Sequence, residues 1–311
     1  MTRSSPGNWV LAVLYAGMIL AWGLNFIFVR LGLASSPPLW LAALRALLGT
    51  AGCAGLFLLW RPRVGLTARE RRDALLLGVP TTGLFFGLWF SAAALVPPGE
   101  VAVIVYTYPL WVVVLDFLLV GQRAPVLAWA SVAIGFLGVV LLEQPWTEGS
   151  SRIPPLAIAE LVLAAASWAV GTVLLKSRIR GPGLRTANVY QLLSGTALLL
   201  LAAAVLEPHP TITLDASLVA SLVWLSLIGT ALAYVVWFML LERFPAPTVS
   251  TWAFLTPVVA LIASVIIFGE RLVPIQLVGV SAVLAGAFVI ARVSASKLSA
   301  ARPPPEGGHV D

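Results

Sequence analysis

The tripeptide Gly121-Gln122-Arg123 returns 148 residues later as Gly269-Glu270-Arg271, and this echo indicates the architecture of the chain. Further residues coincide at the same offset or at an offset of 146. The matched pairs are Trp89-Phe90 with Trp237-Phe238, Pro97 with Pro245, Pro109 with Pro257, Gly138 with Gly286, Trp22 with Trp168, and Arg30 with Lys176. A repeat of about half the chain is too long for a solenoid unit and fits two copies of a membrane bundle.

The composition indicates that the chain lies in lipid. Hydrophobic residues make up 60% of the 311 residues and charged residues 10%, whereas soluble domains carry about 25% charged residues. Four stretches contain no Asp, Glu, Lys or Arg, and each exceeds the roughly 20 residues that a helix needs to cross a bilayer. They are residues 4–29, 74–99, 216–241 and 244–269. The runs are continuous and lack the two-residue alternation of barrel strands, so they predict helices.

Turn residues and charges divide the chain into ten predicted spans, five in each copy. The spans lie near residues 10–32, 38–60, 74–95, 99–120, 125–143, 155–176, 186–206, 217–241, 247–268 and 273–292. We therefore expect an all-α, polytopic membrane protein in which residues 10–143 and 155–292 form two five-helix repeats. Residues 1–9 are expected to form a cytoplasmic N-terminus and residues 144–154 an external linker. Residues 293–311 are expected to form a disordered cytoplasmic tail.

Basic residues predict how the spans are oriented. With a cytoplasmic N-terminus, 15 of the 19 Lys and Arg residues fall on the inner side, as the positive-inside rule requires. Five spans per copy is an odd number, so the second copy enters the membrane from the opposite side. The two copies then form an inverted repeat, which is typical of secondary transporters. The expected location is the cell (inner) membrane, with both termini cytoplasmic. The net charge of +6 reflects topology, and no nucleic-acid partner is expected.

Motifs in both copies resemble a known family. The first copy contains Trp22-Gly23-Leu24-Asn25-Phe26, Pro38, Arg45, Gly121-Gln122-Arg123 and Gly135-Phe136-Leu137-Gly138, and the second contains Trp168, Gly229-Thr230-Ala231, Pro257, Gly269-Glu270-Arg271 and Ala285-Gly286. On these residues the chain resembles the EamA-type permeases of the drug/metabolite transporter superfamily, over about residues 10–292. The resemblance implies a ten-helix permease for which efflux is the expected direction. Two departures are Gln122, where the family usually has Glu, and Gln191, which stands where the first copy has Arg45.

Two prolines, Pro109 and Pro257, occupy matching places in the two copies. A proline inside a helix removes one N–H and frees a carbonyl, which a membrane tolerates only against protein or a water-filled cavity. Kinked helices at corresponding places of two repeats predict a substrate site between them. A packing kink without substrate contact is the alternative. Aromatic and hydroxyl side chains near the prolines are candidates for that site, namely Tyr106, Tyr108, Trp252 and Thr256.

Four tryptophans that the repeat pairs lie inside predicted helices. They are Trp22, Trp89, Trp168 and Trp237, and they could line a cavity or share a packing role. Asn25 lies one helical turn from Trp22 on the same face. An apolar pocket with few polar groups would suit an amphipathic metabolite, aromatic or cationic, through ring faces.

Charged residues inside the spans are further candidates. Arg45 could bind an anionic group, or it could form a structural salt bridge or snorkel to the outer surface. Asp116 could carry a coupling proton, or it could be hydrated near the surface. Small residues, among them Gly138 and Gly286, are expected to let helices pack closely within the chain. A homodimer surface is the alternative, so the protein could be a monomer or a homodimer.

The sequence offers little for enzyme chemistry. Cys53 is the only cysteine, and the two histidines His209 and His309 are too few for a histidine metal site, so neither a metal nor a cofactor is expected. A phosphate-binding P-loop is also missing from the sequence. The sequence therefore predicts a secondary transporter that moves a small molecule by alternating access, with efflux favoured. The substrate would be an amino acid or an amphipathic or cationic compound. A membrane-embedded transferase and an uptake permease of the same fold are the alternatives.

Overall fold

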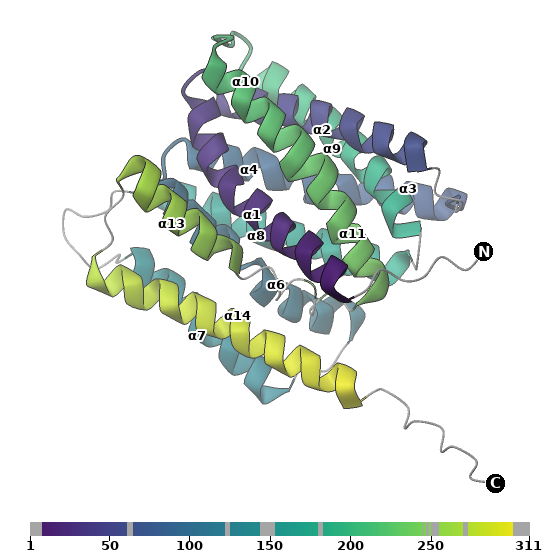
Figure 1. Cartoon of the computed structure of the whole chain (residues 1–311), viewed down its shortest axis with the longest axis vertical. Helices are drawn as coiled ribbons and strands as arrows, with labels where there is room; N and C mark the ends of the chain where they lie inside the picture. Colours follow the sequence, from purple (N-terminus) through teal and green to yellow (C-terminus); the bar gives the residue numbers. More distant parts are fainter. Residues whose placement is uncertain are drawn as a thin grey trace.

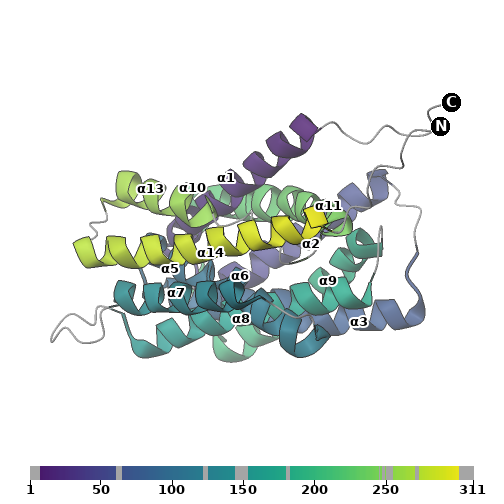
Figure 2. The ribbon, with the colours of Figure 1, turned by 90° about the horizontal axis from the view of Figure 1, so that it is seen from below.

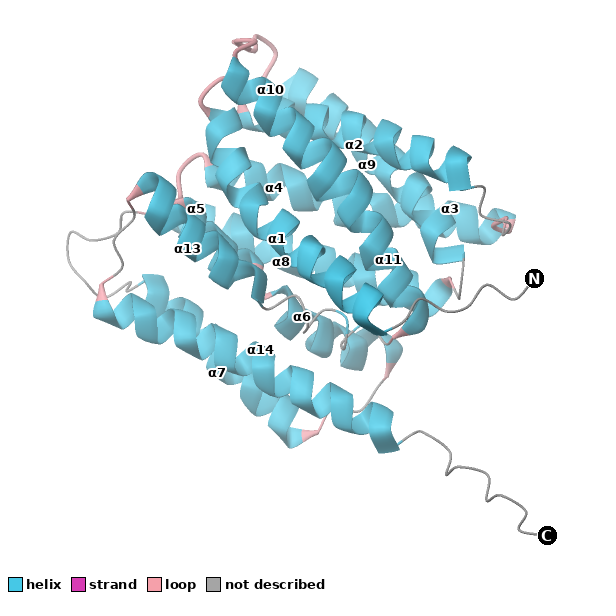
Figure 3. Cartoon of the chain, viewed as in Figure 1, coloured by secondary structure: helices cyan, strands magenta, loops and turns pink. Residues whose placement is uncertain are grey.

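The computed structural model describes residues 8–60, 65–121, 125–143, 153–179, 183–244, 255–269 and 273–300, together with Ala246 and Val249. Within these ranges the chain is helical and contains no strand (Figure 3). Among the described residues, seven helical segments are long and apolar enough to cross a membrane. They are Val13–Leu33, Pro38–Leu59, Ala68–Ala93, Pro98–Val120, Pro155–Arg178, Gly183–Leu206 and Ala216–Arg243. The all-α expectation is confirmed, whereas ten spans in an inverted arrangement stay a prediction.

Three of these segments contain more than one helix, and each of the three includes a π-helical stretch. The first half contains α1 (Asn8–Leu33), α2 (Pro38–Trp60), α3 (Ala68–Gly78), the π-helix η1 (Val79–Leu84), α4 (Phe85–Ala93), α5 (Pro98–Val105), α6 (Tyr108–Leu115), the π-helix η2 (Asp116–Val120) and α7 (Val126–Glu143). The second half contains α8 (Pro155–Arg178), α9 (Gly183–Leu206), α10 (Ala216–Val223), the π-helix η3 (Trp224–Leu232), α11 (Ala233–Arg243), α13 (Thr256–Phe268) and α14 (Pro274–Ala300). Adding the 148-residue offset to η1 gives residues 227–232, which lie within η3.

The two matched prolines lie in the first turns of helices and do not bend continuous ones. Pro109 opens α6, and Pro257 opens α13. Proline is favoured there because the first N–H groups of a helix have no intrahelical partner. Before Pro109 the chain turns tightly, with the Thr107 amide bonded to the Ile104 carbonyl at 3.0 Å. The structure therefore has a break at α5–α6 where the sequence predicts a kink. The residues just before Leu255 lie outside the described part of the chain.

The last helix extends beyond the predicted end of its span. α14 continues to Ala300, so residues 293–300 are helical and the expectation of a disordered tail is wrong for them. Alanine, serine, lysine and leucine in this stretch tolerate a helix, and the first proline comes only at Pro303. Residues 301–311 lie outside the described part.

Helices α7 and α14 lie side by side, as Figures 1 and 2 both show. Small residues permit this contact. A Cβ on Gly138 would lie 2.6 Å from the Gly279 carbonyl oxygen, and a Cβ on Gly286 would lie 2.6 Å from the Ser131 carbonyl oxygen. The predicted role of these glycines in packing within the chain is thus confirmed.

The loop that follows α9 is bonded to the start of α2. The Glu207 carboxylate accepts the backbone amides of Leu39 and Trp40, each at 3.1 Å, and the Trp40 indole donates to the Glu207 carbonyl at 3.0 Å. Two amides that lack an intrahelical partner are thereby satisfied. Nearby, the Asp215 carboxylate accepts the Ser35 hydroxyl at 2.6 Å and the Leu218 amide at 2.8 Å. These hydrogen bonds, that from Ser35 first, hold the pKa of Asp215 below its usual value.

Removal of the Glu207 carboxylate is expected to lower the stability of the fold. Glu207→Ala leaves the first amides of α2 without their acceptor, which costs about 1–2 kcal/mol by analogy with lost helix caps. Thermal unfolding of the detergent-purified protein measures the loss as a lower Tm. Thr211→Ala, an exposed change in the same loop, is the control and should leave the Tm unchanged. Equal Tm values for the two variants would show that this cap contributes nothing.

Candidate functional site

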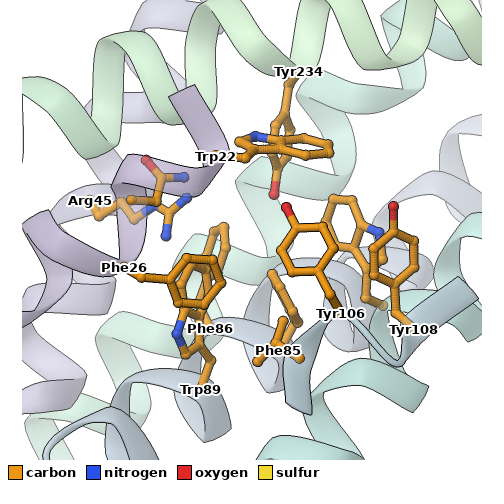
Figure 4. A pocket seen from close by; sticks show the side chains of 12 residues that line it. Trp22, Phe26, Arg45, Phe85, Phe86, Trp89, Tyr106, Tyr108 and Tyr234 are labelled. Carbon is orange, nitrogen blue, oxygen red and sulfur yellow. The ribbon is translucent and has the colours of Figure 1, made fainter. Parts of the chain in front are cut away.

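A cavity lies between helices from both halves of the chain (Figure 4). Its walls are mostly aromatic. The lining residues are Trp22, Asn25 and Phe26 from α1, Arg45 from α2, Phe85, Phe86 and Trp89 from α4, Val105 from α5, Tyr106 from the break, Tyr108 from α6, Trp168 from α8, and Tyr234 from α11. Small-molecule sites are likewise mostly apolar with a few placed polar groups.

Trp22 contacts three other aromatic residues at the cavity. Its ring centroid lies 6.3 Å from that of Trp168, 6.2 Å from that of Tyr234 and 5.3 Å from that of Trp237. Its indole Nε1 donates a 3.0 Å hydrogen bond to the Gly229 carbonyl, which belongs to η3. π-Helical turns of this kind often occur at functional sites. The indole is therefore held at both its ring and its N–H.

Gly229 is required for the approach of α1 to η3. A Cβ at this position would lie 2.2 Å from the end of the Asn25 side-chain amide, which is well inside van der Waals contact. The glycine thus gives the Asn25 amide room beside the cavity. With the amide oriented to satisfy both its groups, Asn25 donates to the Ala21 carbonyl at 3.1 Å and accepts from Arg45 Nη2 at 3.3 Å.

The opposite part of the wall comes from α4 and from the break at α5–α6. Phe26 lies 4.9 Å from Trp89 and 6.0 Å from Tyr106, measured between ring centroids. Tyr106 in turn lies 5.5 Å from Tyr108. Figure 4 shows the hydroxyl groups of Tyr106 and Tyr234 pointing into the space between these rings. The cavity therefore combines aromatic faces with a small number of hydroxyl groups.

Arg45 is the charged residue of this cavity, and it is almost completely buried, with 1% of its surface exposed. Its Nε donates to the Thr230 hydroxyl at 3.2 Å. Its guanidinium carbon lies 4.1 Å from the centroid of the Phe86 ring and 5.1 Å from that of Trp89. Such contacts with ring faces stabilise a buried cation.

The described residues bear on two of the alternatives that the sequence left open for Arg45, a salt bridge and an outward-reaching side chain. Among the described residues no carboxylate lies within salt-bridge distance of its guanidinium, because the two salt bridges found there are Arg178–Asp73 and Arg185–Glu242. The side chain does not snorkel to a surface either, since its head is buried against rings. Binding of an anionic group is the alternative that stays open.

Most residues that the sequence singled out gather at this cavity. Those that line it are Trp22, Asn25, Arg45, Trp89, Tyr106, Tyr108 and Trp168. Trp237 packs behind the wall, with its ring 6.1 Å from Trp168. Thr256 is buried at the start of α13, and Asp116 is partly exposed at the start of η2, and neither lines the cavity. Trp252 lies outside the described residues.

Five lining residues had not been predicted from the sequence. They are Phe26, Phe85, Phe86, Val105 and Tyr234. Two of them could have been found from the repeat. Phe86 and Tyr234 are 148 residues apart, which is the same offset that pairs Trp89 with Trp237. The other three side chains contain no polar atom and have no aromatic counterpart in the other copy. Nothing in the sequence therefore distinguished Phe26, Phe85 and Val105 from neighbouring apolar residues.

Apolar helices of membrane-spanning length around an aromatic cavity are typical of a polytopic membrane protein. Comparison with known families gives the family itself. Residues 7–143 and 155–292 each match the EamA-like transporter family. The chain belongs to this family, and it is accordingly a transporter and not an enzyme.

Relatives extend over nearly the whole chain. A probable amino-acid metabolite efflux pump of Salmonella typhimurium (strain LT2) is 30% identical over 283 residues, which cover 88% of this chain and 91% of that protein. A protein of the same description from Escherichia coli (strain K12) is 28% identical and covers 90% of this chain and 93% of its own length. A solved crystal structure with 20% identity has a TM-score of 0.68 and covers 93% of this chain and 99% of that one. This structural similarity shows that the two chains share a fold.

Proposed function

We propose that this protein is a secondary transporter that exports a small metabolite across the cytoplasmic membrane by alternating access. The observation that carries the proposal is the aromatic cavity, which both copies of the repeat line. A cavity between two repeats is where secondary transporters bind their substrates. The efflux pumps among the relatives support an amino-acid-like metabolite and outward movement.

Contacts between repeat-related residues support a two-fold axis through this region. Thr50 and Thr196 are 146 residues apart, and their hydroxyls lie 3.0 Å from each other in a hydrogen bond. Trp22 and Trp168, also 146 residues apart, have ring centroids 6.3 Å from each other. Two residues related by a two-fold axis can touch each other only close to that axis. These two contacts therefore favour an inverted repeat with the cavity near its axis.

A reciprocal pair of contacts supports the same axis. A Cβ on Gly49 would lie 2.7 Å from Thr230 Cγ2, and a Cβ on Gly195 would lie 2.3 Å from Thr82 Cβ. Gly49 and Gly195 are related by the 146-residue offset, and Thr82 and Thr230 by the 148-residue offset. Each copy thus offers a glycine to the threonine of the other, as a two-fold arrangement requires.

Alternating access requires each repeat to move against the other around a shared site, and a cavity lined by both halves fits this requirement. We further propose ten spans with both termini cytoplasmic, in accordance with the bias of the basic residues.

In sealed vesicles we expect the protein to move its substrate across the membrane without changing it chemically. Full-length protein reconstituted in proteoliposomes that are preloaded with an unlabelled amino acid should accumulate the same labelled compound by counterflow. Mass spectrometry should recover the compound unaltered, since the cavity offers binding groups and the family is one of transporters. Product formation without flux would instead support a membrane-embedded transferase. Vesicles with the protein in one orientation would separate export from uptake.

A further inference from the structure

The surroundings of Arg45 leave its positive charge incompletely satisfied. Nε has a partner in Thr230, and Nη2 has one in Asn25. Nη1 is buried and has no hydrogen-bond partner among the residues that the structure describes. Both partners that exist are neutral. A guanidinium carries five N–H donors in a planar fork and is the group that best matches a carboxylate.

A buried cation without a counterion is expensive for a membrane protein, and such residues usually have a partner in the pathway. Ring faces of Phe86 and Trp89 compensate part of the cost, because the guanidinium carbon lies 4.1 and 5.1 Å from their centroids. They do not occupy the free N–H groups. Arg45 lines the cavity, and Figure 4 shows its side chain reaching toward the space that the aromatic rings surround.

We propose that Arg45 binds the carboxylate of the transported molecule and so selects acids with an apolar or aromatic body. The inference deepens the proposed function, on which it rests. The carboxylate would accept N–H groups of the guanidinium, while the body of the molecule lies against the rings of Trp22, Trp168 and Tyr106.

The same geometry disfavours the cationic substrate that aromatic faces suggested in the sequence. Arg45 already occupies the faces of Phe86 and Trp89, and it would repel a second cation in a medium of low dielectric constant. Gln191 stands at the position in the second copy that corresponds to Arg45, so the charge is present in one half only. One anionic group per substrate is therefore expected.

A matched series of ligands tests the inference on the unmodified protein. The probes are 3-phenylpropionate, L-phenylalanine, L-phenylalaninamide and 2-phenylethylamine, which share a ring and differ in whether they carry a carboxylate. Both carboxylates should raise the Tm of the detergent-purified full chain in a saturable manner. The amide and the amine should bind at least about 10-fold more weakly, because they cannot form the charged bidentate pair. Equal binding of all four probes would overturn the inference, and so would the failure of both acids to raise the Tm.

Substitutions at Arg45 test whether this residue causes the preference for ligands with a carboxylate. Arg45→Gln should lose at least about 10-fold in affinity for both acids, whereas Arg45→Lys should lose less, because its ammonium keeps the charge but not the fork. Arg30→Gln is the control, since Arg30 is exposed on α1 and does not line the cavity. Unchanged affinity in a folded Arg45→Gln protein would overturn the assignment. If Arg45→Gln does not fold, the ligand series and Arg45→Lys still decide the matter.

Different results would contradict the carboxylate site and the transport function. Proteoliposomes that move a neutral or cationic metabolite but ignore both acids would overturn the carboxylate site and leave the transporter in place. Binding of the acids without flux of any metabolite would count against the transporter itself.

Discussion

Gly78→Ala is expected to lower the Tm more than any other single methyl addition to the contact between α3 and α9. A Cβ at Gly78 would lie 2.0 Å from Ser194 Oγ and 2.2 Å from the Gln191 carbonyl oxygen. The second of these atoms is backbone, so α9 itself must move. Overpacking of this kind costs about 1–3 kcal/mol and sometimes more, and we expect the upper end of that range.

The cost is raised by the hydrogen bond that the same contact contains. Ser194 donates to the Leu75 carbonyl at 2.6 Å across the two helices, and the added methyl group would push this pair apart. Thermal unfolding in detergent, followed by the loss of monodisperse protein, measures the effect. Gly55→Ala is the matched control, because a Cβ at Gly55 would meet no atom within 4 Å. Similar Tm values for the two variants would mean that α3 and α9 are packed less closely than the structure shows.

Much of the fold could be predicted from the sequence, because the physics of the bilayer leaves few options. Uncharged runs longer than about 20 residues require helices, and the prediction of an all-α membrane protein is confirmed. Local breaks were harder to predict. Pro109 reads equally well as a kink within a helix and as the start of a new one, and the difference depends on how Thr107 closes the end of α5. The helical extension to Ala300 was missed for a similar reason, since its residues permit a helix but do not require one.

The site could be predicted only in part, and the reason is the uniformity of membrane helices. In a soluble protein an apolar face marks the core, whereas here lipid-facing and cavity-facing residues are both apolar. Tryptophans and tyrosines stood out because the repeat pairs them or a proline lies next to them. Phe85 did not stand out, although its ring centroid lies 5.0 Å from that of Trp168. The partner of Arg45, Thr230, lies 185 residues away and could not be read from any local pattern.

Trp22→Ala is expected to reduce the apparent affinity for the transported molecule by about 10–100-fold, which corresponds to about 1.4–2.8 kcal/mol. The substitution removes a ring that meets Trp168 and Tyr234 in the cavity wall, and it also removes the hydrogen bond to the Gly229 carbonyl. Concentration dependence of counterflow in proteoliposomes measures the change. Trp22→Phe separates the two contributions. It keeps a smaller aromatic ring in place and loses the hydrogen bond, which is worth about 1 kcal/mol.

Trp129→Ala is the control for this prediction, because it removes the same side chain from a different environment. Trp129 lies on α7 with 37% of its surface exposed, and it does not line the cavity. Its loss should leave the apparent affinity unchanged. If Trp22→Ala and Trp129→Ala transport alike, the aromatic cavity is a packing feature and the substrate passes elsewhere. If Trp22→Phe is as defective as Trp22→Ala, the contact with the π-helical turn at Gly229 matters more than the ring, because that hydrogen bond then positions η3 for the motion that transport requires.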